Sequence, residues 1–206
     1  MSAAEITVER LTIEAGGGLL IRDLDLRASG GTMLGVTGPS GSGKTTLLVT
    51  LAGLVPAAAG RLLLDGRPAM LWRDASVGLI LQNLALVPVL SAQETVALPL
   101  QARGIPRREI EQRSADALEA LGLGEHTAQL VAHLSGGQRQ RVAVARALAA
   151  THDVILADEP TSALDEHWRE VVLDLLAAEA RRGAVVIVAS TDSAVITACD
   201  EVLALG

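Results

Sequence analysis

The stretch Gly38-Pro-Ser-Gly-Ser-Gly-Lys-Thr-Thr46 decides the fold of this chain. It matches the P-loop pattern of a glycine, four residues and then Gly-Lys-Thr, and it lies between an apolar strand at 33–37 and a helix that begins at 43 and ends near 54. Glycines let successive main-chain N–H groups point toward a polyanion, and the positive end of the helix dipole faces the same charge. The pattern therefore predicts a site for nucleotide phosphates. The alternative is a Gly/Ser-rich turn that only precedes a helix.

Length, composition and charge limit the class of protein. The 206 residues suffice for one domain with a large core, and half of them are apolar, yet no uninterrupted apolar run approaches the roughly 18 to 20 residues that cross a bilayer. The N-terminus lacks the features of a secretory signal, and the one cysteine, Cys199, excludes an internal disulfide, so we expect a soluble, cytoplasmic protein. The formal net charge of -7 argues against a nucleic-acid partner.

The hydrophobic pattern predicts an α/β fold. Apolar runs at 77–81, 154–157, 185–189 and 202–205 alternate with helical stretches, which is typical of parallel strands with crossover helices. Residues 6–26 alternate around three glycines and, like 61–64, predict antiparallel strands. Between 91 and 134 only helices are expected. We predict one domain over 1–206: a P-loop NTPase core with a mostly parallel sheet, an N-terminal antiparallel β subdomain and a helical insertion at about 91–134.

A second glycine motif, Leu134-Ser-Gly-Gly-Gln138, opens a predicted helix. Ser135 is a good N-cap, and Gln138 three residues on completes a capping box. Gly136 and Gly137 leave room for a phosphate to approach the first helical N–H groups. An ordinary helix start is the alternative, but it leaves unexplained two glycines that cost about 1 kcal/mol each relative to alanine.

Two adjacent acids, Asp158 and Glu159, follow the apolar run 154–157. An aspartate at a strand end beside a P-loop can hold Mg²⁺ together with the Thr45 hydroxyl. Glu159 can polarise a water for attack on the γ-phosphate, so it is the predicted general base. A solvated strand end is the alternative for the two acids.

With these motifs in order, the chain resembles the nucleotide-binding subunits of ATP-binding cassette (ABC) transporters over nearly its full length. In that family the P-loop is followed by a glutamine loop, a signature motif, an Asp-Glu pair, a D-loop and a switch histidine. Here Gln82, residues 134–138, residues 158–159 and residues 162–165 match the first four. Gln82 could be a mere strand cap, but the resemblance implies a Mg²⁺ ligand and water sensor.

The resemblance also implies how the protein works. Two chains would sandwich two ATP molecules head to tail, with the P-loop of one facing residues 134–138 of the other and Asp165 at the same interface. The dimer, expected to be a homodimer, would hydrolyse ATP and drive a transmembrane permease from the inner face of the membrane. The residues expected to bind ATP are Gly38, Pro39, Ser40, Gly41, Ser42, Gly43, Lys44, Thr45 and Thr46 with Ser135, Gly136, Gly137 and Gln138.

Two positions depart from the family pattern. Thr191 occupies the place of the switch histidine, and because its side chain is shorter and uncharged, its contact to the γ-phosphate would be weaker or water-mediated and turnover slow. Ala15 occupies the place of the aromatic residue that stacks on adenine, a contact worth about 1 to 3 kcal/mol, so adenine affinity should suffer. Trp72 or Trp168 could compensate, or could simply pack. The histidines are expected at the surface or at helix ends, at 126, 133, 152 and 167.

The sequence leaves alternatives for the protein's binding partner and for what its ATP binding drives. Residues 94–100 resemble the MacB, LolD and FtsE-like branch, and would form a surface for a coupling helix of the permease. The alternative is ordinary core packing of Val96, Leu98 and Leu100. A second hypothesis is an ATP-gated dimerisation switch with little hydrolysis. A third is a soluble ABC protein acting on DNA or ribosomes, which the acidic charge disfavours.

Overall fold

The computed structural model describes residues 4–68 and 77–206. The chain divides into two compact units. The sheet unit comprises Met1–Leu79, His152–Glu159 and Leu175–Gly206, and the helical unit comprises Ile80–Thr151 and Pro160–Asp174. The assignment of residues 1–206 to a single domain stays a prediction.

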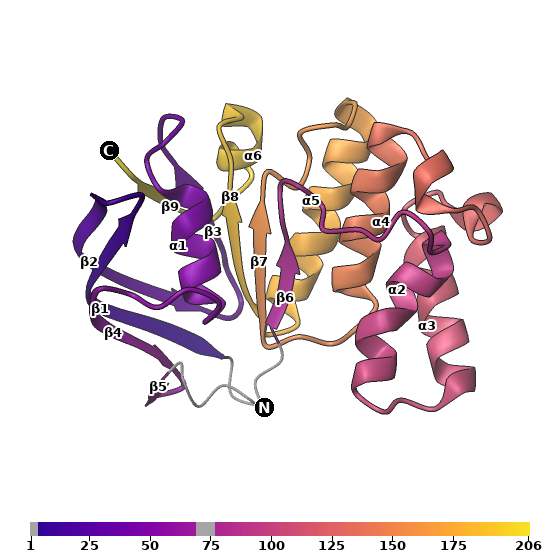
Figure 1. Ribbon diagram of the computed structural model, residues 1–206, viewed down its shortest axis with the longest axis horizontal. Helices are drawn as coiled ribbons and strands as arrows, with labels where there is room; N and C mark the ends of the chain where they lie inside the picture. The colour runs from indigo at the N-terminus through magenta and orange to yellow at the C-terminus, as the bar shows by residue number, and fades with distance from the viewer. Residues whose placement is uncertain (1–3, 69–76) are drawn as a thin grey trace. The chain divides into compact units, whose positions relative to one another are not determined.

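A five-stranded sheet forms the centre of the sheet unit, in the order β6-β7-β8-β3-β9 (Figure 1). Its strands are β3 (Met33–Thr37), β6 (Val77–Ile80), β7 (Val154–Asp158), β8 (Val185–Ala189) and β9 (Glu201–Ala204). Pairing is parallel between β7 and β8, β8 and β3, and β3 and β9. Every residue of β7 and β8 is buried, as expected of central parallel strands covered on both faces. The predicted parallel sheet is confirmed.

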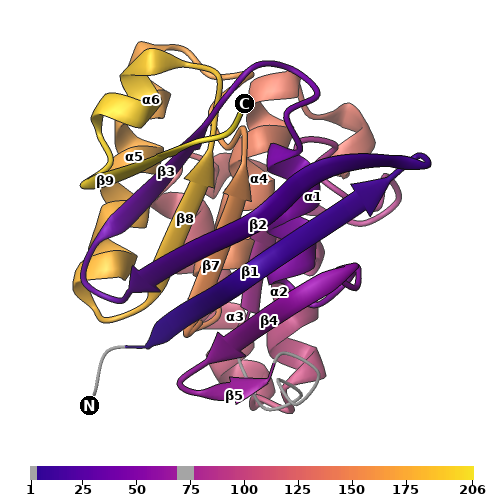
Figure 2. The same cartoon turned by 90° about the vertical axis from the view of Figure 1, so that its left-hand side faces the viewer.

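An antiparallel sheet of four strands completes the sheet unit, in the order β2-β1-β4-β5 (Figure 2). Its strands are β1 (Glu5–Ala15), β2 (Gly18–Ser29), β4 (Ala59–Leu64) and β5 (Arg67–Pro68). Gly16 and Gly17 make the tight turn between β1 and β2 at φ 60° and 79°, values that glycine adopts without steric cost. The predicted antiparallel subdomain is confirmed. Its core is aliphatic, with Ile6, Leu11 and Ile13 packed in one cluster with Leu47 and Ile187.

The helical unit contains α2 (Ala92–Ala102), α3 (Arg107–Glu119) and α4 (Gly136–Leu148), the 3₁₀ turns η2 (Gly124–His126) and η3 (Val131–His133), and the beginning of α5 (Glu166–Arg181). Ser91 caps α2 in a capping box with Glu94, as the sequence predicts. Val96 and Leu100 of α2, Leu118 of α3 and Val142 of α4 are fully buried. The expectation of helices between 91 and 134 is confirmed, and one isolated bridge joins Ser91 to Leu130.

Three details differ from the predictions. Helix α1 (Lys44–Leu51) ends earlier than expected, because Gly53 at φ 72° and the bond from the Leu54 N–H to the Val49 carbonyl close it as a Schellman motif. Strand β9 begins and ends one residue earlier. His152, expected at the surface or at a helix end, is only 5% exposed and packs against Gly78, where a side chain would overlap the imidazole.

Trp72 lies outside the described residues. Among residues 4–68 and 77–206, no helix combines the length and the apolar character that a membrane span needs.

Candidate functional site

The loop between β3 and α1 adopts a conformation that only glycine favours at three positions. Gly38, Gly41 and Gly43 have φ angles of 151°, 84° and 93°. A Cβ atom on Gly38 would overlap the carbonyl oxygen of Leu205, and Gly43 is the N-cap of α1 without contributing a capping side chain. The first-turn N–H groups of α1 therefore face a loop of glycines, which is the arrangement that binds phosphate at a helix N-terminus.

The Lys44 side chain lies beneath this loop. It is 8% exposed, and its Nζ donates to the carbonyl oxygens of Gly38 at 2.6 Å and Pro39 at 3.1 Å. The neighbouring Ser42 hydroxyl is buried, and no hydrogen-bond partner for it lies within the described residues. A buried hydroxyl without a partner is unfavourable, so a phosphate oxygen would satisfy Ser42 while Lys44 neutralises its charge. The chemistry of the loop fits a nucleotide polyphosphate.

Thr45 and Asp158 meet at the edge of the P-loop. The Thr45 hydroxyl donates to Oδ2 of Asp158 at 2.6 Å, and Asp158 is 1% exposed. Burial raises the pKa of Asp158, and the negative charge of Glu159 adds to this, whereas the Thr45 hydrogen bond and Lys44 lower it. A hydroxyl and a buried carboxylate are hard oxygen ligands, which suit Mg²⁺, and the cation would favour the ionised carboxylate.

Glu159, the next residue, has a left-handed backbone conformation with φ 47°, which is costly for a non-glycine residue. The end of β8 holds it there: its N–H donates to the Ala189 carbonyl at 2.9 Å. Its carboxylate accepts from the Ser190 hydroxyl at 2.8 Å, and from the Thr191 N–H at 2.7 Å and hydroxyl at 3.1 Å. The structure thus brings Glu159 and Thr191 together.

Ser190 is a site residue that sequence reasoning misses. It is fully buried, and its hydroxyl also accepts from the Asp192 N–H at 3.1 Å. The signal available in the sequence is weak, a small hydroxyl residue directly after a buried strand and before Thr191. Together Ser190 and Thr191 fix the direction of the Glu159 carboxylate.

The helical unit contains the second motif. Ser135 caps α4 in a complete capping box: its hydroxyl accepts from the Gln138 N–H at 3.2 Å, and its own N–H donates to Oε1 of Gln138 at 2.8 Å. A Cβ on Gly136 would meet no atom within 4 Å, whereas one on Gly137 would lie 3.0 Å from the Ala163 carbonyl oxygen. Gly136 therefore leaves the helix start open, and Gly137 allows close packing against the loop before α5.

Side chains further along α4 tie it to that same loop. Gln140 is 2% exposed and donates to the Pro160 carbonyl at 2.8 Å. The Arg141 guanidinium lies 4.1 Å from the centre of the Trp168 ring and donates to the Leu121 carbonyl at 2.6 Å. Burial lowers the pKa of Arg141 and the nearby Asp165 opposes this, so Arg141 is not a freely solvated charge. Trp168 has a packing role within the helical unit.

The predicted site residues thus fall into two groups. The P-loop residues 38–46, Asp158, Glu159 and Thr191 lie in the sheet unit, and residues 134–138 and Gln82 lie in the helical unit. Gln82 is exposed in the turn that follows β6, and Ala15 is exposed at the end of β1.

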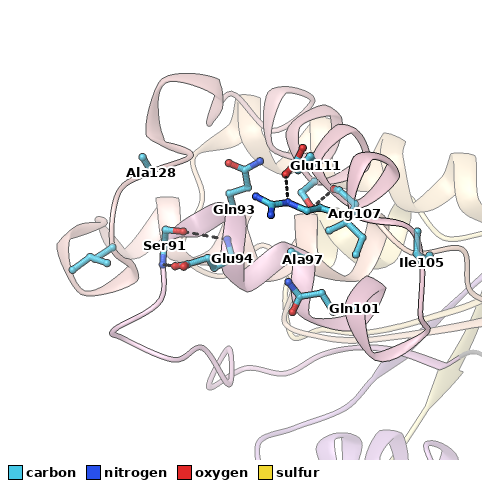
Figure 3. A pocket seen from close by; sticks show the side chains of 12 residues that line it. Ser91, Gln93, Glu94, Ala97, Gln101, Ile105, Arg107, Glu111 and Ala128 are labelled. Atoms are coloured by element: carbon cyan, nitrogen blue, oxygen red, sulfur yellow. Dashed lines mark hydrogen bonds and ion pairs between the residues drawn. The ribbon is translucent and has the colours of Figure 1, made fainter.

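The helical unit also has a pocket of about 1030 Å³ between α2, α3 and the segment before η3 (Figure 3). Ala97, Ile105 and Leu130 form part of its apolar lining, and Arg107 and Glu111 form an ion pair at 2.8 Å along its edge. Large apolar side chains are exposed nearby along the chain: Val87, Val89, Leu98 and Leu130.

Comparisons with known proteins agree with this geometry. A family model described as ABC transporter matches residues 21–162. The chain is 43% identical over 188 residues to the taurine import ATP-binding protein TauB of Pseudomonas aeruginosa, covering 89% of this chain and 71% of that protein. It is 39% identical over 171 residues to the uncharacterized ABC transporter ATP-binding protein y4fO of Sinorhizobium fredii, covering 82% of this chain and 50% of that protein. The chain thus spans about half the length of that relative.

Solved structures show the same fold. A dimeric structure of MJ0796, described as a bacterial ABC transporter cassette, superimposes with a TM-score of 0.90 at 30% identity, over 97% of this chain and 94% of the other. A dimeric post-hydrolysis state of MJ0796 bound to ADP and Pi gives a TM-score of 0.89 at 29% identity, with the same coverage.

Proposed function

Because the chain belongs to the ABC transporter family of ATP-binding proteins, we propose that it binds Mg²⁺ and ATP in a head-to-tail homodimer and hydrolyses the ATP to drive a transmembrane permease. The proposal is carried by three contacts: Lys44 donates to the glycine loop, the Thr45 hydroxyl donates to Asp158, and Glu159, directly after Asp158, accepts from Ser190. TauB is named for taurine import, and the cargo of this chain is not part of the proposal.

The candidate site residues of the sheet unit have distinct tasks in this proposal. The main-chain N–H groups of residues 38–46 bind the phosphates, and Lys44 neutralises their charge. Thr45 and Asp158 would hold the Mg²⁺, which would offset negative charge on the β- and γ-phosphates. The role of Gln82, in the helical unit, as a further ligand stays a prediction. Asp158 would bind Mg²⁺ in its ionised form, so the cation would oppose the effect of burial, which raises the pKa of Asp158.

Glu159 is the proposed general base. It takes a proton from the attacking water at its carboxylate, and Ser190 and Thr191 orient that carboxylate through three hydrogen bonds. Thr191 is also the proposed donor to the γ-phosphate, in place of a histidine. Since its hydroxyl is shorter and already bonded to Glu159, the proposal includes slow turnover.

The signature residues Ser135, Gly136, Gly137 and Gln138 of one chain are proposed to face the γ-phosphate bound by the other. The open space beside Gly136 and the capped start of α4 support this, because a phosphate can approach the helix N–H groups there. Asp165, which accepts from the Trp168 N–H at 2.9 Å, is proposed to lie at the same interface.

The dimer predicts how the ATPase rate depends on protein concentration. If neither chain completes a site alone, the rate per chain falls on dilution below the dissociation constant of the dimer and reaches a plateau above it. A steady-state assay with Mg²⁺ and ATP over a wide range of protein concentrations measures this. A rate per chain that is constant at every dilution would contradict the composite site.

The permease is proposed to bind the exposed apolar side chains of the helical unit. Val87 and Val89 are 44% and 76% exposed on either side of Pro88, and Leu98 of α2 is 41% exposed, whereas Val96 and Leu100 are fully buried. Core packing thus accounts for Val96 and Leu100, and the exposed Leu98 is left for a partner. In cells, Val89→Asp should release the chain from membranes while its basal ATPase is kept. If the Val89→Asp protein stayed on the membranes, the proposal that the permease binds this surface would be wrong.

The proposed location on the inner face of the membrane follows from the permease. The relation to the MacB, LolD and FtsE-like branch also stays a prediction. A second candidate function is an ATP-gated dimerisation switch with little hydrolysis, which Thr191 and Ala15 favour over fast turnover. A dimer that forms with ATP but releases phosphate at the rate of the Glu159→Gln protein would support the switch.

A further inference from the structure

His126 makes a direct hydrogen bond to the signature glutamine. It is the last residue of η2, and its Nε2 lies 3.1 Å from Nε2 of Gln138. On the other side of the ring, Nδ1 lies 2.9 Å from Oε1 of Gln129. The Gln129 Nε2 then donates to the His133 carbonyl at 3.0 Å. His133 is the residue directly before the motif, so these contacts connect the two ends of residues 134–138.

One main-chain group, the Ser135 N–H, fixes the direction of the hydrogen bonds that join Gln138, His126 and Gln129. The Ser135 N–H can only donate, so the atom of Gln138 that lies 2.8 Å from it is the amide oxygen. The amide nitrogen of Gln138 then faces His126, and Nε2 of His126 must accept. The ring proton is therefore on Nδ1, from which it is donated to Oε1 of Gln129.

We propose that His126 is a positioning residue for the signature motif, acting through Gln138. By accepting from the Gln138 amide, it holds the glutamine side chain in the orientation that closes the capping box on Ser135. The first-turn N–H groups of α4 and the Ser135 hydroxyl then keep the geometry that a phosphate needs. The inference rests on the proposed function, since it presupposes that this motif binds ATP from a second chain.

The segment that supplies these groups is itself held by α2. The Ala92 N–H donates to the Gln129 carbonyl at 2.9 Å, and the Gln93 N–H donates to the Thr127 carbonyl at 3.0 Å. Figure 3 shows Gln93 and Ala128 on the rim of the pocket, at the start of α2 and on the segment opposite. His126 and Gln129 therefore act from a fixed segment.

The chemistry of position 126 defines a conservative and a disruptive variant. In His126→Gln the amide oxygen can accept from Gln138 and the amide nitrogen can donate onward. In His126→Leu neither bond can form, and Gln138 must find another partner. His167→Gln makes the same chemical change as His126→Gln at an exposed histidine of α5 whose ring contacts Trp168, and it serves as the control.

The first test is ATP-dependent dimerisation of the Glu159→Gln protein, measured by sedimentation over a range of ATP concentrations. Adding His126→Leu should raise the ATP concentration for half-maximal dimer about three- to tenfold, the effect of one hydrogen bond, whereas His126→Gln and His167→Gln should stay within about twofold. An unchanged midpoint in His126→Leu would overturn the positioning role. No dimer in the Glu159→Gln parent would instead reject the proposed function.

The second test needs neither ATP nor a partner. In ¹⁵N spectra of the nucleotide-free protein at pH 8, the ring of His126, identified by its loss in His126→Gln, should carry a proton on Nδ1 and none on Nε2. Gln138→Leu should remove the bond to Nε2 and shift that nitrogen. A proton on Nε2 in the parent protein, or a ring unaffected by Gln138→Leu, would overturn the proposal even if every variant folds and dimerises normally.

Discussion

The P-loop of the sheet unit and the signature motif of the helical unit present different chemical groups to a phosphate. In the sheet unit the P-loop is surrounded by charged side chains that are largely buried, with Lys44 and Asp158 at 8% and 1% exposed. In the helical unit the signature motif offers a hydroxyl and main-chain N–H groups, and no acidic residue occupies the first turn of α4. In the proposed function, the P-loop region binds the nucleotide and activates water, whereas the signature motif only completes the coordination of the phosphate. Removing a charged side chain near the P-loop should therefore affect ATP binding or hydrolysis. Blocking the signature motif should instead affect formation of the dimer.

The largest expected effect is on the chemical step. Glu159→Gln should reduce kcat by about 10² to 10⁴-fold, since the amide cannot take a proton from water, while ATP binding is kept. Lys44→Ala should instead weaken ATP binding, because the phosphates lose their cation. Steady-state ATPase assays and nucleotide titrations separate the two. Equal turnover by the parent and Glu159→Gln proteins would remove Glu159 from the role of base.

The next effect concerns Thr191, which donates two hydrogen bonds to Glu159 and, in the proposed function, takes the place of a histidine. A well-placed donor to the transition-state phosphate is worth about 10² to 10³ in rate, so Thr191→His should increase kcat by up to this factor. Thr191→Val is the matched control, since it keeps the shape of threonine without the hydroxyl, and it should lower kcat. A fast parent enzyme that Thr191→Val leaves unchanged would show that this hydroxyl has no part in turnover.

A smaller effect is expected on the affinity that comes from recognition of the nucleotide's purine base. Because Ala15 provides no ring for stacking, binding should depend mainly on phosphates and Mg²⁺, and the affinities for ATP and GTP should lie within about tenfold. Ala15→Tyr should tighten binding by up to about 1 to 3 kcal/mol. Titration of fluorescent ATP and GTP against both proteins measures this. A strong preference of the parent for ATP would mean that another group recognises adenine.

The smallest expected effect is on stability. The pKa of Asp158 is raised in the folded state, so folding is favoured when Asp158 is protonated, and this contribution is lost as the pH rises through the raised pKa. At pH 7, without nucleotide, Asp158→Asn should therefore increase Tm, because the amide carries no charge that must be buried. The difference should shrink as the pH approaches the ordinary carboxyl pKa.

Mg²⁺ and ATP should reverse this order of stability. They should stabilise the parent protein and affect Asp158→Asn little, because the variant has lost a ligand for the cation. Thermal unfolding at several pH values, with and without Mg²⁺ and ATP, tests both parts. A parent protein that is more stable than Asp158→Asn at pH 7 without nucleotide would contradict the cost of burying this carboxylate.

The sequence predicts the fold well because its signals are local. The P-loop glycines, the buried runs of β7 and β8 and the capping boxes at Ser91 and Ser135 each specify structure within a few residues. The early end of α1 also has a local signal, Gly53, in the position that a Schellman motif favours.

The missed parts of the site depend on contacts between distant segments. Ser190 reaches Glu159 only because β7 and β8 end side by side, and Arg141 reaches Trp168 only because α4 and the start of α5 pack together. His126 ends η2 and meets Gln138 across residues 127–137, which include η3. A single sequence does not show which distant segments contact one another, so nothing in it distinguishes these side chains from ordinary surface residues.

The claim that each ATP is bound between the P-loop of one chain and the signature motif of another can be tested in one measurement. The mass of the Glu159→Gln protein is determined by sedimentation with ATP, alone and with Gly136→Asp added. A Cβ on Gly136 meets no atom of its own chain, so an aspartate there should leave the fold and ATP binding intact but place a negative charge against the partner's phosphate. We predict a dimer with ATP for Glu159→Gln and a monomer for the double variant. A dimer of equal ATP dependence in both would contradict the composite site.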